Sequence, residues 1–459
     1  MATTLSGRVV GSLLVLSAAL TACTGSDDPD PGPTSPPPLV VVDLDFGVWG
    51  TEEEVAAYRD VVEVYDQETD EVEIEVTAYP THGALLDAIK QGDVPDVFLA
   101  DRSDLAYLLE EKVTQPIGER LDERDVDFGD DYSRAALEAF AFDRDLQCMP
   151  YGISPLVVYY NTALVDFDLM AERGLEVPNL STDARLRWSL EEFRVAAEFA
   201  TRPRRGTSGL YVPPTLDGLS PFVLSGGGRI FDDDDDPTSL DLSSGDSRSA
   251  LEEALPVLRD PRLTLTPERL ARRTPATWFE RGKLGMIVGD RSLTAAFRRV
   301  PGLKFGVMPM PTLDDAVTVG RISGMCIAAD TPDLAESADL LVDVISADSL
   351  RRVVPAGYLV PANQTVALTD DFLQPARQPS RADVFNDSVR DLYVPPLLDD
   401  ETALQEAVEP AIELLLNVEI PDIEALTTQI DEASQAVLSP PEPTDDPSGS
   451  ESPPESTDD

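Results

Sequence analysis

The chain has 459 residues, of which 86 are acidic and 35 are basic, so its formal net charge at pH 7 is −51. A field of this sign repels polyanions and argues against binding of nucleic acid or anionic lipid headgroups by charge. With one histidine, His82, and three cysteines, a histidine-based catalytic triad or a zinc site is improbable. We therefore expect no enzyme, no metal and no cofactor.

The first 22 residues have the pattern of a secretion signal. Arg8 precedes the apolar run Val9–Leu20, which is too short to span a bilayer. The run ends in Leu-Thr-Ala-Cys, with Cys23 last, and this resembles the lipobox of bacterial lipoproteins, in which the chain is cut before the cysteine and its sulfur is lipidated. We predict a signal peptide over residues 1–22 and a lipid anchor on Cys23. The alternative is an ordinary secretion signal followed by a chance cysteine.

Proline-rich segments flank the part of the chain expected to fold. The linker, residues 23–38, has no large apolar side chain after its cysteine, and the tail, residues 440–459, has six prolines, seven acids and no base. Neither segment can bury a core, so both are expected to be disordered. About 400 residues remain between them, more than one core usually holds, which predicts two lobes.

Strands and helices alternate along this folded part. Thr51 and Glu54 have capping-box spacing, as do Ser189 and Glu192, and Thr81 can cap a third helix. The alternation predicts a mostly parallel sheet covered on both faces, followed by a second α/β region. We predict strands at 72–77, 96–99, 157–160, 284–288 and 304–307, and helices after 51, 81 and 189 and at 105–109, 247–258, 293–299, 335–345, 402–416 and 423–437.

A series of short motifs runs in order over almost the whole folded part. They are FGVWG from Phe46, GDVPDVF from Gly92, PYG from Pro150, YYN from Tyr159, WSLEEF from Trp188, GGGRIF from Gly226, FERGK from Phe279, MPMP from Met308 and SG at Ser323. In this order they resemble the family 1 extracellular solute-binding proteins, the receptors of bacterial ABC importers for maltose and other sugars. The resemblance implies an α/β fold of two lobes, each a sheet flanked by helices, with hinge strands between them and a ligand cleft.

The resemblance also implies how the chain is divided. We expect residues 39–149 and 326–375 in lobe 1, and residues 153–322 and 380–439 in lobe 2. On this map Cys148 and Cys326 fall on adjacent hinge segments, and we hypothesise a disulfide between them.

The ligand site is expected at loops that follow strands, where open α/β sheets bind their ligands. Aromatic faces and charged side chains there would hold a polar solute. Several of these residues have a plain structural alternative: Trp49 and Trp278 could pack in the protein, and Asp101 and Arg102 could pair at the surface. The expected ligand-binding residues are Trp49, Asp101, Arg102, Tyr151, Trp278, Asp290, Arg291, Gly324, Met325 and Tyr358.

The function implied by the resemblance is that of a receptor anchored on the outer face of the cytoplasmic membrane. It would capture a small polar solute, a sugar or oligosaccharide, by lobe closure and deliver it to ABC permease subunits, as a monomer and without nucleic acid. Aromatic residues make up only 6% of the chain, fewer than sugar-binding members usually have. The alternatives are a sensor or interaction lipoprotein that kept the fold, and a secreted glycosidase with two catalytic acids.

Overall fold

The computed structural model describes residues 41–69, 71–126, 129, 131–181, 185–417 and 422–440. The predicted signal peptide, the lipidation of Cys23, the linker and all but the first residue of the tail lie outside this part. Within it, no helix is both long and apolar enough to cross a membrane.

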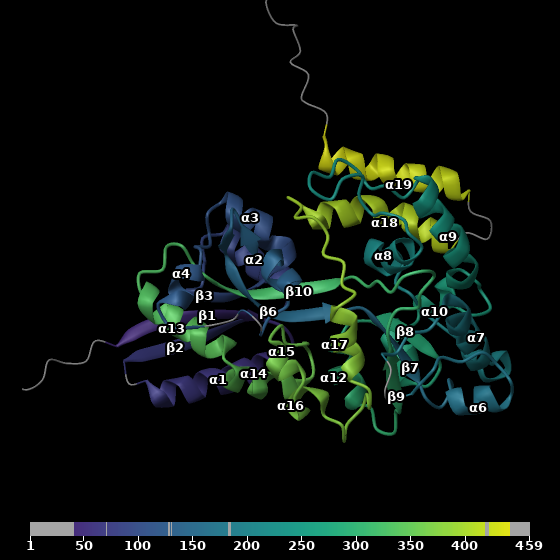
Figure 1. Ribbon diagram of the computed structural model, residues 1–459, viewed down its shortest axis with the longest axis horizontal. Helices are drawn as coiled ribbons and strands as arrows, with labels where there is room; N and C mark the ends of the chain where they lie inside the picture. The colour runs from purple at the N-terminus through teal and green to yellow at the C-terminus, as the bar shows by residue number, and fades with distance from the viewer. Residues whose placement is uncertain are drawn as a thin grey trace, which may run out of the picture. The chain divides into compact units, whose positions relative to one another are not determined.

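A first sheet has five strands in the order β2-β1-β3-β10-β6 (Figure 1). β1 is parallel to β2 and β3, whereas β10 is antiparallel to β3 and β6. Four of the five strands therefore point the same way, which confirms the predicted mostly parallel sheet, and β10 alone runs against them. Since β6 carries the chain out of this sheet and β10 carries it back, β10 must run against its neighbours. The strands are β1 (Val42–Trp49), β2 (Val72–Tyr79), β3 (Val97–Asp101), β6 (Cys148–Pro155) and β10 (Gly320–Ile327).

A second sheet has three strands in the order β8-β7-β9, and both of its strand pairs are antiparallel. Its central strand buries Tyr159, whose ring contacts Phe297 and Phe305. A separate hairpin pairs two short strands before β6. These strands are β7 (Val157–Asn161), β8 (Met286–Gly289), β9 (Phe305–Met308), β4 (Ala141–Phe142) and β5 (Asp145–Leu146).

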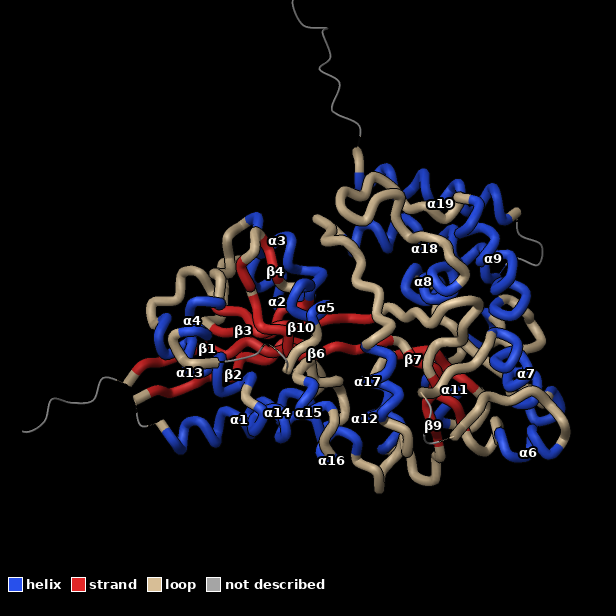
Figure 2. Tube along the Cα trace, in the orientation of Figure 1, coloured by secondary structure: helices blue, strands red, loops and turns tan. Residues whose placement is uncertain are grey.

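Helices pack on both faces of the first sheet, α2 on one and α1 on the other, and α14 packs against α1 (Figure 2). The helices in this part of the chain are between 4 and 17 residues long. They are α1 (Glu52–Glu68), α2 (His82–Lys90), α3 (Leu105–Glu110), α4 (Gly118–Asp122), α5 (Arg134–Ala139), α13 (Leu334–Ile345), α14 (Ala347–Val353), α15 (Gln364–Ala367) and α16 (Asp370–Leu373), with 3-10 turns η1 (Arg102–Asp104) and η3 (Val354–Ala356).

The remaining helices accompany the second sheet and the C-terminal end of the described chain. α18 packs on α19, and both contact α9. The set is α6 (Phe167–Glu172), α7 (Leu190–Ala200), α8 (Leu216–Ser225), α9 (Gly245–Leu258), α10 (Pro267–Leu270), α11 (Pro275–Glu280), α12 (Ser292–Arg298), α17 (Asp383–Val389), α18 (Glu401–Asn417) and α19 (Ile423–Leu438), with the 3-10 turn η2 (Pro203–Arg205).

The predicted caps begin three of these helices. The Thr51 and Thr81 hydroxyls accept hydrogen bonds from backbone N–H groups in the first turns of α1 and α2. Ser189 and Glu192 form a complete capping box at α7, each accepting from the backbone N–H of the other. Two sheets, each flanked by helices, form the two-lobe α/β fold that the sequence predicts.

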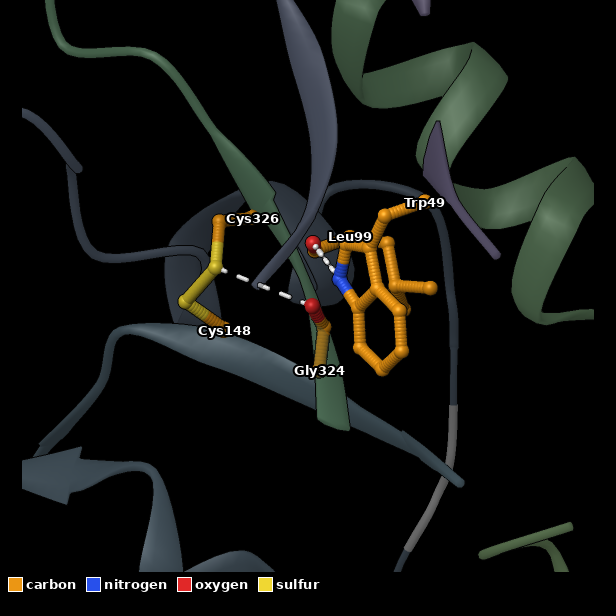
Figure 3. Close-up of a disulfide and its surroundings, with 5 residues drawn as sticks. All are labelled: Trp49, Leu99, Cys148, Gly324 and Cys326. Carbon is orange, nitrogen blue, oxygen red and sulfur yellow. Dashed lines mark hydrogen bonds between the residues drawn. A yellow bond between two sulfur atoms is a disulfide. The ribbon is translucent and has the colours of Figure 1, made fainter. Parts of the chain in front are cut away.

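A disulfide joins β6 to β10 (Figure 3). Cys148 and Cys326 are partners in the β6–β10 register, and their Cα atoms are 4.3 Å apart. Both side chains are fully buried. The pairing is the one that the two-lobe resemblance led us to expect, and it ties together the strands that leave and re-enter the first sheet.

Candidate functional site

A pocket lies where the end of β3 meets β10, α8 and α18. The space is about 750 Å³, part of it open to solvent. Its walls come from both sides of the two-sheet fold, which is where a cleft between lobes would lie. The pocket is lined by Asp101, Arg102, Ser103, Leu216, Asp217, Ser220, Ile230, Phe231, Val319, Gly320, Arg321, Ile322, Tyr393, Pro395, Leu398, Glu401, Leu404 and Gln405.

Asp101 is fixed at the floor of this pocket by two partners. Its carboxylate accepts hydrogen bonds from the Ser103 backbone N–H and hydroxyl, at 3.1 and 2.8 Å. Its other oxygen accepts from Arg321 Nε at 3.2 Å. Because Asp101 is only 4% exposed, these bonds hold the carboxylate in a single position from which it can accept further bonds from a ligand.

Arg321 connects this carboxylate to an aromatic group. Its guanidinium lies 5.1 Å from the centre of the Trp49 ring, a cation–π contact. The Trp49 indole N–H donates to the Leu99 carbonyl at 2.7 Å (Figure 3), and its ring meets His82 edge to face at 5.8 Å. Burial lowers the pKa of Arg321, but the nearby carboxylates outweigh burial and raise its pKa overall. Arg321 therefore stays charged.

Arg102 and Glu401 both line the pocket and attract each other electrostatically. Arg102 Nε donates to the Ala139 carbonyl at 3.1 Å, and burial lowers the pKa of its guanidinium despite the pull of Glu401. Burial, together with the negative charges of Asp217 and Asp101, raises the pKa of Glu401 to about 7. Glu401 thus exchanges between donor and acceptor near neutral pH.

Two more acids complete the polar lining and its surroundings. Asp217, in the first turn of α8, keeps contact with solvent, yet loss of solvation raises its pKa, with Arg321 opposing and Asp101 adding to the rise. Burial, together with the charge of Asp290, raises the pKa of Glu54, at the start of α1, to about 7. The site is rich in carboxyl groups held near two arginines.

The structure brings four of the predicted residues to this region. Asp101 and Arg102 line the pocket, and Trp49 lies beside it under Arg321. Asp290 is within electrostatic range of Glu54 and Arg321. Its carboxylate accepts from the Ser292 backbone N–H at 2.9 Å, so it caps the turn that opens α12.

Two predicted residues are instead buried in the protein interior. Tyr151 is 1% exposed and packs against Tyr58, with 6.0 Å between ring centres. Arg291 is fully buried between the rings of Phe372 and Phe385, at 4.3 and 4.7 Å. Neither side chain reaches the pocket, because aromatic neighbours from distant segments enclose it.

The other four predicted residues also lie outside the pocket lining. The side of Gly324 that lacks a side chain faces Phe140, whose ring would be 2.9 Å from an added Cβ, and Met325 is fully buried. Tyr358 is 9% exposed and its hydroxyl lies 3.4 Å from Glu53. Trp278 lies on α11, where its indole N–H donates to the Arg269 carbonyl at 3.1 Å.

Most of the lining escaped the sequence prediction. Asp217 and Ser220 lie on α8, a helix that was not predicted because Pro221 inside it disguises the helical pattern. Glu401 begins α18, one residue before the predicted helix at 402–416. Arg321 lies five residues before Cys326, which was expected on a hinge segment. The start of a predicted helix and the residues beside a predicted hinge are therefore the sequence signals that could have identified Glu401 and Arg321.

Within the described residues, no group of three or more histidine, cysteine or acidic side chains is arranged to hold a metal ion. The five acids around the pocket are instead spaced among arginines, serines and a tyrosine. This mixture of donors and acceptors suits the hydroxyl groups of a polar organic ligand.

The family profile described as bacterial extracellular solute-binding protein matches residues 60–379 of the chain. This match extends over most of both sheets and includes the β3 end of the pocket. The chain therefore belongs to the bacterial extracellular solute-binding protein family. No curated protein sequence gives a significant match.

Solved structures of low sequence identity share the fold. The chain resembles an ABC substrate-binding protein from Listeria monocytogenes in complex with cycloalternan, with 18% identity and a TM-score of 0.73, covering 86% of this chain and 99% of that one. It also resembles the GacH receptor of Streptomyces glaucescens, solved unliganded and with acarbose, with 18% identity, a TM-score of 0.69 and coverage of 87% and 99%. UgpB from Mycobacterium tuberculosis in complex with glycerophosphocholine has 18% identity and a TM-score of 0.69, covering 86% of this chain and 98% of that one.

Proposed function

We propose that this chain is the lipid-anchored receptor of an ABC importer and that it captures a sugar or oligosaccharide in the pocket at the end of β3. The observation that supports the proposal is the lining itself: carboxylates, guanidinium groups and a tyrosine hydroxyl from elements on both sides of the fold converge on one space. Sugar receptors of similar fold, such as the cycloalternan- and acarbose-bound proteins, add to this support.

Binding would act by closing the lobes around the solute. Asp101 and Arg321 are already held in place, so they can bind hydroxyl groups without reorganising. A solute shifts the balance between open and closed forms only by its extra affinity for the closed form. The closed form would then dock on permease subunits at the outer face of the cytoplasmic membrane.

The solute class can be tested by thermal shift, because a ligand that binds only the folded state raises the melting temperature. The chain from Thr24 to Ser439 is screened against sugars, polyols, amino acids and short peptides. We expect a rise with sugars or oligosaccharides. A rise in melting temperature confined to amino acids or peptides would contradict the proposed sugar ligand. No rise with any compound would contradict the receptor function.

The position of the site is tested by two matched variants. Asp217→Asn and Asp246→Asn each remove an acid from the second position of a helix, in α8 and α9, but only Asp217 lines the pocket. We expect the thermal shift to fall in the first variant and to persist in the second. Equal shifts in both would contradict the assignment of the pocket.

The anchor is a separate part of the proposal. Replacing Cys23 by serine removes the sulfur that would carry the lipid. We expect the native chain in the membrane fraction and Cys23→Ser in the soluble fraction. Equal fractionation of both would contradict the lipid anchor while leaving solute binding untouched.

A further inference from the structure

A basic surface stands out on this acidic protein, beside the second sheet and away from the pocket. It consists of eight side chains from α6, η2 and the α10–α11 region: Arg173, Arg202, Arg204, Arg205, Arg269, Arg272, Arg273 and Lys283. Among the described residues, none of the eight forms an ion pair with a carboxylate.

Backbone and side-chain contacts make this surface continuous. Arg269 donates to the Ser208 hydroxyl at 2.6 Å and to the Gly206 carbonyl at 3.0 Å. Lys283 donates to the Arg205 carbonyl at 3.0 Å. The α10–α11 region is therefore bound directly to η2, and the charges of the two segments add in one area.

Two aromatic rings organise the guanidinium groups. Phe199 lies between Arg173 and Arg202, with 5.2 and 5.8 Å from each guanidinium carbon to the ring centre. Trp278 lies in the same way by Arg269 and Arg273, at 4.4 and 5.5 Å. The rings hold the arginines without neutralising them, because a cation–π contact leaves the positive charge in place.

We propose that this basic surface binds the chain's own acidic tail, residues 440–459. The tail carries seven acids and no base. The surface carries eight bases that form no ion pair with any described residue, and Glu268 of α10 lies within electrostatic range of one of them, Arg272. A tethered segment of opposite charge has a high effective concentration, which compensates for the small contribution of each exposed ion pair. The tail is thereby a built-in competitor for any other polyanion.

The tail is long enough to reach. Ile423, in the first turn of α19, lines a pocket together with Arg262. Leu263, the residue after Arg262, accepts a backbone hydrogen bond from Gly209, which lies beside the basic surface. The tail leaves the other end of α19, about 24 Å away for a helix of 16 residues. Twenty extended residues span up to about 66 Å, so the acids of the distal half can cover the surface.

The direct test places a nitroxide on the tail through Ser450→Cys in the chain beginning at Thr24. That residue is the single free thiol, since Cys148 and Cys326 are bonded. At low salt we expect the amide NMR signals of residues 202–207 and 269–273 to lose at least about half of their intensity. We expect recovery at about 0.5 M salt, where charges are screened beyond roughly 4 Å. No selective loss at low salt would overturn the proposal.

Matched charge reversals separate this surface from a general attraction. The surface variant is Arg204→Glu with Arg205→Glu and Arg272→Glu, and the control is Arg59→Glu with Arg134→Glu and Arg144→Glu. All six arginines are exposed and both variants change the net charge equally. We expect the signal loss to vanish in the surface variant and to persist in the control. Persistence in both would overturn the proposal.

Competition gives an independent readout. Inorganic polyphosphate is titrated into the chain ending at Ser439 and into the chain ending at Asp459. We expect at least about threefold tighter binding without the tail, because the surface is then uncovered. Equal binding, or binding to anionic phospholipid vesicles that the tail does not reduce, would overturn the tail as occupant.

Discussion

Two Asp-Arg pairs, one at the end of β3 and one directly after β8, have the same sequence context but different surroundings. Asp101 and Arg102 both line the pocket, whereas Asp290 lies near it and Arg291 is enclosed by Phe372 and Phe385. A charged residue after a strand is thus a candidate for contacting the ligand only if no distant segment covers it. The rings that cover Arg291 come from parts of the chain over 80 residues further on.

Of these four residues, the buried Arg291 should contribute most to the stability of the fold. Arg291→Ala removes a side chain that fills the space between two rings, so we expect a loss of about 3 kcal/mol in the free energy of unfolding. Arg291→Met keeps most of the volume and removes a buried charge whose Nε and one terminal nitrogen have no hydrogen-bond partner. We expect it to cost less than about 1 kcal/mol. Urea denaturation measures both, and equal losses would contradict the packing role.

The pair that lines the pocket should dominate binding. Asp101→Ala removes a fixed acceptor and leaves Arg321 without its carboxylate partner, so we expect at least about tenfold weaker solute binding, or roughly 1.4 kcal/mol. Titration calorimetry with the solute found by thermal shift measures it. Arg291→Met serves as the control, because its side chain does not reach the pocket. If that variant weakened binding as much as Asp101→Ala, the contrast between the two strand ends would be lost.

Titration of the site acids sharpens the comparison further. The pKa of Glu401 is raised to about 7 in the folded protein, above that of an ordinary glutamate, so the folded state holds a proton that the unfolded chain has released. Stability is therefore greatest below about pH 4.5 for this group and falls as the pH rises through 7. We expect the loss to be about 3 kcal/mol, because the pKa rises from 4.5 in the unfolded chain to about 7. Glu401→Gln should flatten this pH dependence in denaturation measurements, whereas Glu138→Gln, an exposed acid of α5, should not.

The residues beside the pocket should have smaller effects. Trp49→Ala removes the ring beneath Arg321, and Asp290→Ala removes a charge near it, so we expect each to weaken binding by about threefold without unfolding the protein. Calorimetry and circular dichroism measure the two properties. Unchanged affinity in both variants would reject their place in the site.

The smallest effect is expected at Trp278, the tryptophan of the basic surface. Trp278→Ala should leave solute affinity within about 0.3 kcal/mol of the native value, because the ring contacts Arg269 and Arg273 instead of the pocket. A tenfold loss of solute affinity would instead show that Trp278 belongs to the ligand site.

The sequence predicted the elements better than the site. Caps at Thr51, Thr81 and Ser189 depend on residues three positions apart, so local reading suffices for them. The pocket depends on how α8 and α18 pack against β3, which no local pattern encodes. Asp217 and Glu401 were missed for this reason, whereas Asp101 and Arg102 were found because a strand end is visible in the sequence.

The disulfide has a consequence for the covalent topology of the molecule. Cys148 and Cys326 are 178 positions apart, so the bond closes a ring that contains β7, β8 and β9. A protease that cuts once anywhere within this ring leaves two fragments that remain one covalent molecule. The second sheet can thus be nicked without being shed, and reduction after limited proteolysis would reveal the cut.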